Sequence, residues 1–326
     1  MLLLTAAEQN VSSLKKMRIY QKLSDKISAQ PKALSVLQNI GDVTTYHEDY
    51  GVRHPLASYN VSILNVAKRI LSTLNVLEEA QNMRAFESPK NKDWEAPLTE
   101  ATDHMLDALM EHMDDCGGIL RSFFPSSSDV NFKKIFNEFK KSVDPYRNHI
   151  GAIVNYIKHN QGRLRSISFS WSDGSSLGYF VEGPIAGGGL GPVSTIHPTG
   201  NTAFSYNRDI PYHICNLYAV SANLASALYS VDKKLVASKK QPKTVGNPSE
   251  LSQVLDKAAS LPMFFFEDEL SKGVPKITTG SKYFTIDYPA NKAKPNAPPG
   301  GSRIAISFRG DGVTSSFKMP YFNEKS

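Results

Sequence analysis

The stretch that decides the fold is DPYRNHIGAIVNYIKHNQGRLRSISFSW, residues 144–171, where a helical pattern gives way to a strand pattern. Asp144-Pro145 is typical of a helix start, because proline fits the first helical position. This helix is predicted to run to about Asn160, where Gln161-Gly162 ends it. From Leu164 to Trp171 apolar and polar residues alternate one by one, which predicts a half-buried strand. The chain is therefore expected to change from helical to sheet structure near residue 162.

Before this junction the sequence predicts four more helices with mostly short connections. Each has apolar side chains at three- and four-residue spacing, which indicates a helix with one buried face. The predicted helices cover residues 11–28, 59–86, a stretch that begins after Pro97, and a stretch that begins after Asp129. Together with the junction helix they predict an antiparallel helical bundle over residues 1–162.

After the junction the pattern is mixed. Asp173-Gly174 predicts a hairpin turn between the strand at 164–171 and a second strand at 177–181. Further on, the pattern predicts a long helix over 209–236, a short helix over 248–260 and late strands over 283–288 and 303–309. We therefore predict an α+β fold with two domains, the helical bundle (1–162) and an α+β domain (163–326) with a mostly antiparallel sheet. The two halves are expected to pack tightly.

Composition limits the class of protein. Of the 326 residues, 40% are apolar and 21% are charged, which is ordinary for a globular protein and speaks against wholesale disorder. The sequence shows neither a signal-peptide core nor a run of about twenty apolar residues, so we expect a cytoplasmic protein that does not enter a membrane. Cys116 and Cys215 are too isolated for a disulfide framework or a zinc site, so no metal or cofactor is expected.

Charge is distributed unevenly along the chain, although its net value of +6 merely permits a polyanionic partner. Residues 90–115 carry eight acidic side chains and two lysines, whereas residues 131–165 carry eight basic side chains and two acidic ones. The basic segment predicts nucleic-acid contacts, but the same asymmetry arises when two faces of one bundle pair their charges. The nucleic-acid-binding candidates are Lys133, Lys134, Lys140, Lys141, Lys158, Arg163 and Arg165.

The junction helix also carries candidates for chemistry. Arg147, Gly151, Asn155 and His159 follow one another at four-residue steps and so lie along one stripe of the helix. Such a stripe could hold a phosphate backbone, and a histidine beside an arginine could act as acid or base in RNA cleavage. Alternatively, these polar groups pair with the acidic helix or cap the neighbouring strand.

The run Arg147-Asn148-His149, followed by Asn155-x-x-Lys158-His159-Asn160, resembles the HEPN group of all-helical bacterial domains. The resemblance covers at most residues 1–165. It implies a helical module of a bacterial defence or toxin system, with Arg147, Asn148 and His159 as catalytic residues of a metal-independent ribonuclease. The usual signature of the group, an arginine followed at short distance by its histidine, is not present in that form.

Three other segments contain residue types that can bind a ligand. Arg208, Asp209 and His213 cluster at the amino end of the long helix, where an anion is favoured, so they are candidates for a small phosphorylated ligand. The alternative is that Asp209 merely caps the helix. The glycine run 187–191 lacks the following helix that a phosphate-binding loop requires and predicts a hairpin loop instead. On the acidic helix, His112 and Cys116 are too few to hold a metal.

Three functions are compatible with these patterns. The first is a non-enzymatic binding subunit of a bacterial intracellular complex, with anti-phage defence as one setting, that recognises nucleic acid or a protein partner. The second is the HEPN-like ribonuclease, and the third is a sensor of a small phosphorylated ligand. A homo-oligomer is compatible with the sequence as well.

Overall fold

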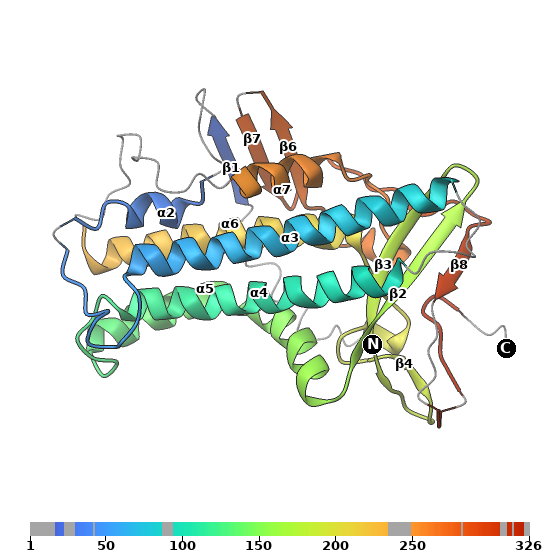
Figure 1. Ribbon diagram of the computed structural model, residues 1–326, viewed down its shortest axis with the longest axis horizontal. Coiled ribbons are helices and arrows are strands. Elements are labelled where there is room, and N and C mark those ends of the chain that lie inside the picture. Colours follow the sequence, from blue (N-terminus) through green and yellow to red (C-terminus); the bar gives the residue numbers. More distant parts are fainter. Residues whose placement is uncertain are drawn as a thin grey trace.

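The computed structural model of the chain describes residues 17–22, 30–41, 43–86, 94–233, 249–281, 283–306, 312–314 and 316–322. Its fold is α+β, as the sequence predicts. Long helices run beside one another, with one sheet at an end of the molecule and a second, smaller sheet along one side (Figure 1).

Antiparallel helices form the main layer. They are α2 (Lys32–Leu37), α3 (Pro55–Phe86), α4 (Glu95–Arg121), α5 (Val130–His159) and α6 (Tyr206–Val231). Two hydrogen bonds set the direction of α3 against α4, because Ser62 meets His112 while Thr73 donates to the carbonyl of Ala101. The helices predicted around 59–86 and after Pro97 are therefore confirmed.

The basic segment forms one helix where the sequence predicted two. Helix α5 begins after Asp129, whose side chain accepts from the backbone N–H groups of Asn131 and Phe132, as an N-cap does. It then continues through Pro145 to His159. A proline removes one helical hydrogen bond, but its ring can be accommodated when packing holds the turns on either side. The predicted break before Pro145 is wrong for this reason, since Val143 and Tyr146 are both buried against the rest of the bundle.

Helix α6 comes from the second half of the chain and packs inside the bundle. Thr102 on α4 meets Tyr206 on α6 at 2.9 Å, and Tyr146 on α5 meets His213 at 3.0 Å. Tyr59 on α3 donates to Ser221 over 2.9 Å. One continuous cluster of buried apolar side chains therefore contains residues from both sides of residue 162. The division into two domains stays a prediction.

Within the described residues, α6 is the one helix long and apolar enough to cross a membrane by length and composition. Of its most apolar window, 61% is buried inside the protein. A core helix of a soluble protein meets the same two criteria.

The larger sheet stands at one end of the helical layer. It contains β2 (Arg163–Trp171), β3 (Gly174–Pro184), β4 (Leu190–Pro192), β5 (Phe204–Ser205) and β8 (Arg303–Ile306), in the order β4-β3-β2-β8 with β5 beside β3. All of these pairs are antiparallel. The predicted hairpin is confirmed, with Trp171 opposite Gly174. A Cβ atom at Gly174 would lie 2.7 Å from the indole of Trp171, so a side chain there would force the indole to move.

The smaller sheet corrects the first helix prediction. Its order is β1 (Met17–Lys22), β7 (Tyr283–Tyr288) and β6 (Lys276–Gly280), all antiparallel. The helix predicted over 11–28 is wrong for residues 17–22, and the rest of that interval lies outside the described residues. The partner strand β7 is far away in sequence, so the spacing of apolar residues within 11–28 could not predict the pairing. Helix α7 (Ser249–Ser260) packs on α3 and β6, whereas most of the lysine-rich segment 233–243 lies outside the described residues.

Candidate functional site

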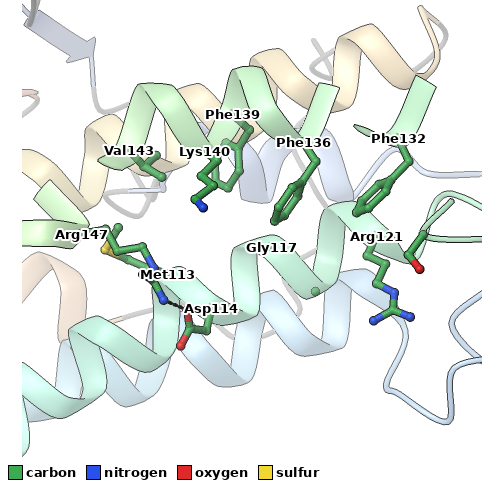
Figure 2. A pocket seen from close by; sticks show the side chains of 12 residues that line it. Met113, Asp114, Gly117, Arg121, Phe132, Phe136, Phe139, Lys140, Val143 and Arg147 are labelled. Carbon is green, nitrogen blue, oxygen red and sulfur yellow. Dashed lines mark hydrogen bonds and ion pairs between the residues drawn. The ribbon is translucent and has the colours of Figure 1, made fainter. Parts of the chain in front are cut away.

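A groove of about 430 Å³ lies between α4 and α5, and it contains two of the residues that the sequence singled out (Figure 2). Its floor is apolar and comes from both helices, while charged side chains stand at its rim. We call it the α4–α5 groove. The floor residues are Met113, Phe132, Phe136, Phe139 and Val143, and the charged rim residues are Asp114, Arg121, Lys140 and Arg147.

Two glycines and a pair of phenylalanines shape the floor. Gly117 and Gly118 sit inside α4, where a side chain would otherwise fill the space towards α5. A Cβ atom at Gly117 would come 3.3 Å from the ring of Phe136, whereas one at Gly118 would meet nothing within 4 Å. Phe136 stacks on Phe132 with 5.1 Å between ring centroids. The glycines therefore let the aromatic rings approach α4 and leave a hollow beside them.

The cations at the rim differ in how they are held. The guanidinium of Arg121 lies 4.5 Å from the ring centre of Tyr50, whose hydroxyl donates to the carbonyl of Phe124. Arg147 donates to Asp114 at 2.9 Å in an exposed ion pair. Lys140 is exposed, and no carboxylate of the described residues forms an ion pair with it. The rim thus holds three cations and one carboxylate.

The acidic face of α4 neutralises one half of the basic helix. Besides the Arg147–Asp114 pair, Lys158 meets Asp107 at 2.8 Å, and this hydrogen bond raises the pKa of Lys158. These two pairs match the alternative in which the charges of two helices pair with each other. Nearer the start of α5, the described carboxylates leave four exposed lysines without an ion pair, namely Lys133, Lys134, Lys140 and Lys141. Positive charge therefore remains at the groove end of α5.

Two further candidates lie on the sheet. Arg163 is exposed at the start of β2. Arg165 is buried, with a side-chain exposure of 9%, and its guanidinium makes two hydrogen bonds to Glu182, at 2.8 and 2.9 Å. A guanidinium that donates through Nε and Nη2 to the two oxygens of a buried carboxylate ties β2 to β3. The structure therefore places Arg165 apart from the exposed lysines of α5.

The three catalytic candidates are spread along α5. Asn148 and His159 are exposed, while Arg147 pairs with Asp114. Arg147 and His159 lie on the same helix, and a rise of about 1.5 Å per residue puts them about 18 Å apart along its axis. The structure brings neither into hydrogen-bond contact with the other.

Asp209 and His213 lie in a buried chain of hydrogen bonds rather than in an open pocket. The hydroxyl of Tyr179 donates to Asp209 at 2.6 Å, Asp209 meets Nε2 of His213 at 3.1 Å, and Nδ1 of His213 meets the hydroxyl of Tyr146 at 3.0 Å. Burial alone would raise the pKa of Asp209, but His213 and Tyr179 lower it to about 2. This chain links β3, α6 and α5 inside the protein.

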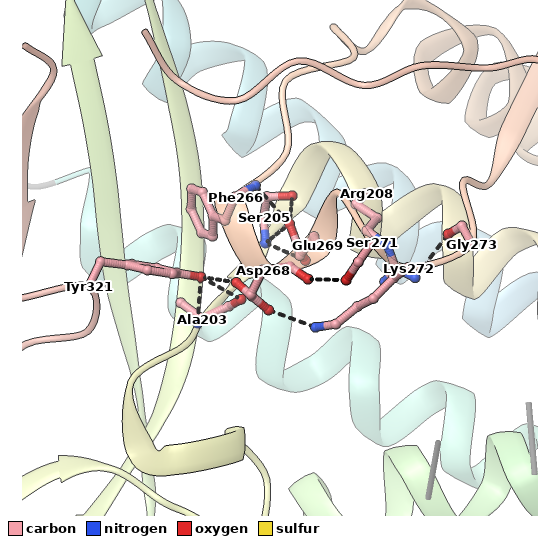
Figure 3. A network of polar contacts seen from close by, with 10 residues as sticks. All are labelled: Ala203, Ser205, Arg208, Phe266, Asp268, Glu269, Ser271, Lys272, Gly273 and Tyr321. Carbon is pink, nitrogen blue, oxygen red and sulfur yellow. Dashed lines mark hydrogen bonds and ion pairs between the residues drawn. The ribbon is translucent and has the colours of Figure 1, made fainter. Parts of the chain in front are cut away.

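The amino end of α6, where the sequence predicted an anion, contains the protein's own carboxylate (Figure 3). Glu269, in the short turn η3 (Glu267–Glu269), accepts from the backbone N–H and the hydroxyl of Ser205 and from the N–H of Phe266. Burial raises the pKa of Glu269 to about 7, while Arg208 and Ser205 counteract the rise. Ser205 is the N-cap of α6, so the Glu269 carboxyl group occupies the helix end where the sequence predicted an anion.

Neighbouring side chains complete this network. Arg208 donates to the carbonyl of Gly273 at 3.0 Å and stacks over the ring of Tyr212. Lys272 pairs with Asp268 at 2.8 Å, and the hydroxyl of Tyr321 donates to the same carboxylate. The predicted ligand residues thus bind parts of the chain itself. The glycine loop forms the β3–β4 turn and hydrogen-bonds Ser316 and Lys318.

Sequence reasoning missed Glu269 and the apolar floor of the groove. Glu269 lies 64 residues after Ser205, and no local pattern joins them. The sequence does contain Gly117-Gly118 on one helix and Phe132 and Phe136 on the next. Whether these residues come into contact depends on how α4 packs on α5. Among the described residues, no group of three or more His, Cys, Asp or Glu side chains could hold a metal ion.

The α4–α5 groove is thus the feature that combines an open cavity with the predicted cations. Comparison with protein-family models, with characterised proteins and with solved structures finds no match to this chain.

Proposed function

We propose that this protein is a non-enzymatic binding subunit that holds nucleic acid at the α4–α5 groove. The observation that carries the proposal is the apolar, aromatic groove whose rim carries Arg121 and Lys140, with further exposed lysines beside it on α5. A cationic surface attracts the phosphate backbone, and an aromatic floor offers a face to an unpaired base. Single-stranded nucleic acid fits this combination better than a duplex, whose bases are stacked inside.

The arrangement of charges supports the same reading. Where α4 is acidic, it pairs with Arg147 and Lys158, and a polyanion would gain little there. Among the residues that line the groove, the acidic side chain contributed by α4 is Asp114, and it is paired with Arg147. The groove end of α5 is therefore the part of the basic segment that is left for a phosphate backbone.

A protein partner is the second candidate, and the apolar floor favours it. A partner segment with an apolar anchor and acidic flanks would bury the anchor on Phe136 and Val143 and pair its carboxylates with Lys140 and Arg121. Such binding depends less on salt than binding to a phosphate backbone does. The bacterial defence setting and the cytoplasmic location are further parts of this proposal, and they rest on the sequence alone.

The proposal is tested by fluorescence anisotropy with labelled single- and double-stranded RNA and DNA, titrated at several salt concentrations. We expect binding to single strands that weakens steeply with salt, because each phosphate contact releases a counterion. Intact oligonucleotide on a denaturing gel after incubation supports a binding role, whereas cleavage that is lost in His159→Ala supports the ribonuclease alternative. Absence of binding to every strand at low salt contradicts the proposal.

A further inference from the structure

The rim of the α4–α5 groove contains a side chain that a phosphate backbone has no use for. Asp114 is the one carboxylate among the residues that line the groove, and the other charged side chains of the lining are cations. Its side chain is 60% exposed, so a molecule in the groove can reach it. A phosphate is repelled by a carboxylate. If the groove holds nucleic acid, Asp114 therefore faces a part of the strand other than its phosphates.

Asp114 has acceptor positions to spare. Arg147 donates to its Oδ1 over 2.9 Å, and no hydrogen bond joins its Oδ2 to any residue that the structure describes. The two oxygens of a carboxylate offer about four lone-pair positions between them. Arg147 therefore holds the carboxylate in place and leaves most of its acceptor positions open to a bound molecule.

The aromatic floor lies close to this carboxylate (Figure 2). Asp114 precedes Gly117 by about one turn of α4, which is about 4.5 Å along the helix axis. A Cβ atom at Gly117 would come 3.3 Å from the ring of Phe136. Phe136 is half-buried, whereas Phe132 and Phe139 are buried, so Phe136 is the most exposed of the three rings in the floor. A base that stacks on Phe136 therefore has the carboxylate of Asp114 within about one helical turn.

A carboxylate discriminates between bases by their hydrogen-bond donors. Guanine presents two adjacent donors, N1–H and N2–H, which match the two oxygens of a carboxylate. Adenine and cytosine each present an amino group beside a ring nitrogen that accepts, and uracil presents one N–H between two carbonyl oxygens. In these three bases an acceptor therefore faces the carboxylate and repels it.

On the basis of the proposed nucleic-acid binding, we propose that Asp114 reads guanine. The groove holds a single strand with one unpaired guanine stacked on Phe136, and the Watson–Crick edge of that guanine donates to Asp114. The phosphates on either side lie towards Lys140 and Arg121, the rim cations that have no carboxylate partner among the described residues.

The assay compares strands that differ in one base. Fluorescence anisotropy at low salt measures the affinity for a labelled oligouridine with a single central guanosine, adenosine or inosine. We expect the guanosine strand to bind about fivefold to tenfold more tightly than the adenosine strand, which stacks on an aromatic ring but lacks the paired donors. Inosine keeps N1–H and lacks the amino group, so its strand should fall between the two.

Matched variants assign the preference to Asp114. Asp114→Asn keeps the size of the side chain but replaces one acceptor oxygen with a donor, so the guanosine-to-adenosine ratio of affinities should fall to about one. The ratio is taken within each protein, which removes the effect of the altered net charge on overall affinity. Asp115→Asn makes the same change at the exposed neighbour, which does not line the groove, and should keep the wild-type ratio.

The outcomes separate this preference from nucleic-acid binding itself. Equal affinity for the guanosine and adenosine strands overturns guanine reading, while salt-dependent binding of both strands still supports the proposed function. A guanosine preference that survives in Asp114→Asn overturns the role of Asp114. Absence of binding to every strand at low salt overturns the proposed function and guanine reading together.

Discussion

At the scale of single residues, Glu269 places a carboxyl group where the sequence suggested that an anionic ligand would bind. Its carboxylate lies at the start of α6 and accepts three hydrogen bonds, two of them from Ser205. Its pKa is nevertheless raised to about 7 by burial, from an ordinary value of 4.5. Burying the charged form of Glu269 therefore costs free energy that burying the neutral form does not.

This shift makes a prediction for Glu269→Gln. Between pH 4.5 and 7 the folded protein holds a proton on Glu269 that the unfolded chain has released, so the contribution of this residue to stability falls as pH rises through that window. The full difference is roughly 3 kcal/mol. In urea unfolding at pH 5 and pH 8, the free energy of unfolding of Glu269→Gln relative to that of the wild type should be higher at pH 8. A gap between the two proteins that does not change with pH would show that Glu269 is not protonated in the folded state.

A buried histidine predicts the opposite pH dependence. His112 lies between α3 and α4, meets Ser62 at 2.8 Å and has a pKa lowered by burial to about 4. Below pH 6.5 the unfolded chain binds a proton that the folded protein refuses until about pH 4, so stability is lost as pH falls through this window, by roughly 3 kcal/mol. His112→Gln should lose less stability than the wild type between pH 7 and pH 4.5 in urea unfolding. Equal losses would contradict this role.

At the scale of elements, the groove depends on glycines in the middle of a helix. Gly118 is exposed in α4, and a Cβ atom there meets nothing within 4 Å. Gly118→Ala should therefore raise the free energy of unfolding by about 0.5–1 kcal/mol, because alanine favours the helix. Gly117→Ala is the matched comparison, since its Cβ would press on Phe136 at 3.3 Å, and it should stabilise less. Chemical denaturation measures both, and a loss of stability in Gly118→Ala would contradict the open hollow.

The elements also show what the sequence could and could not predict. Helical spacing identified α3, α4 and α7, because each has one face that the core must bury, and it also identified α6, which is buried on most sides. It could not identify β1, whose partner β7 comes from the far end of the chain. The break expected at Pro145 failed because tertiary packing on both sides holds α5 together.

For the candidate site, the sequence shows which side chains are basic, but it does not show which groups surround each of them. The lysines of α5 are exposed, as solvated charges are. Whether each cation is paired depended on the register of α4 against α5, which sets Asp114 beside Arg147 and Asp107 beside Lys158. The burial of Arg165 depended on Glu182 in the neighbouring strand. Such contacts are long-range, and one sequence carries no direct record of them.

At the scale of the whole molecule, α6 makes the helical layer depend on the second half of the chain. Ser221 on α6 accepts hydrogen bonds from the hydroxyl of Tyr59 and from the backbone N–H of Ala33. We predict that a fragment of residues 1–162 fails to unfold cooperatively, because it lacks the helix that completes its core. In calorimetry the full chain should show one unfolding transition. The fragment of residues 163–326 is measured as the matched comparison. A cooperative transition in the isolated 1–162 fragment would instead establish two independent domains.

The central claim concerns the α4–α5 groove, and a charge-matched pair of variants tests it most directly. Lys140→Glu reverses a charge at the rim of the groove, whereas Lys68→Glu makes the same change on the exposed face of α3, so both proteins have the same net charge. The measurement is the salt dependence of the affinity for a labelled single-stranded RNA. We predict that Lys140→Glu weakens binding and lowers the salt slope by about one, while Lys68→Glu binds as the wild type does. Equal behaviour of the two variants would contradict binding at the groove.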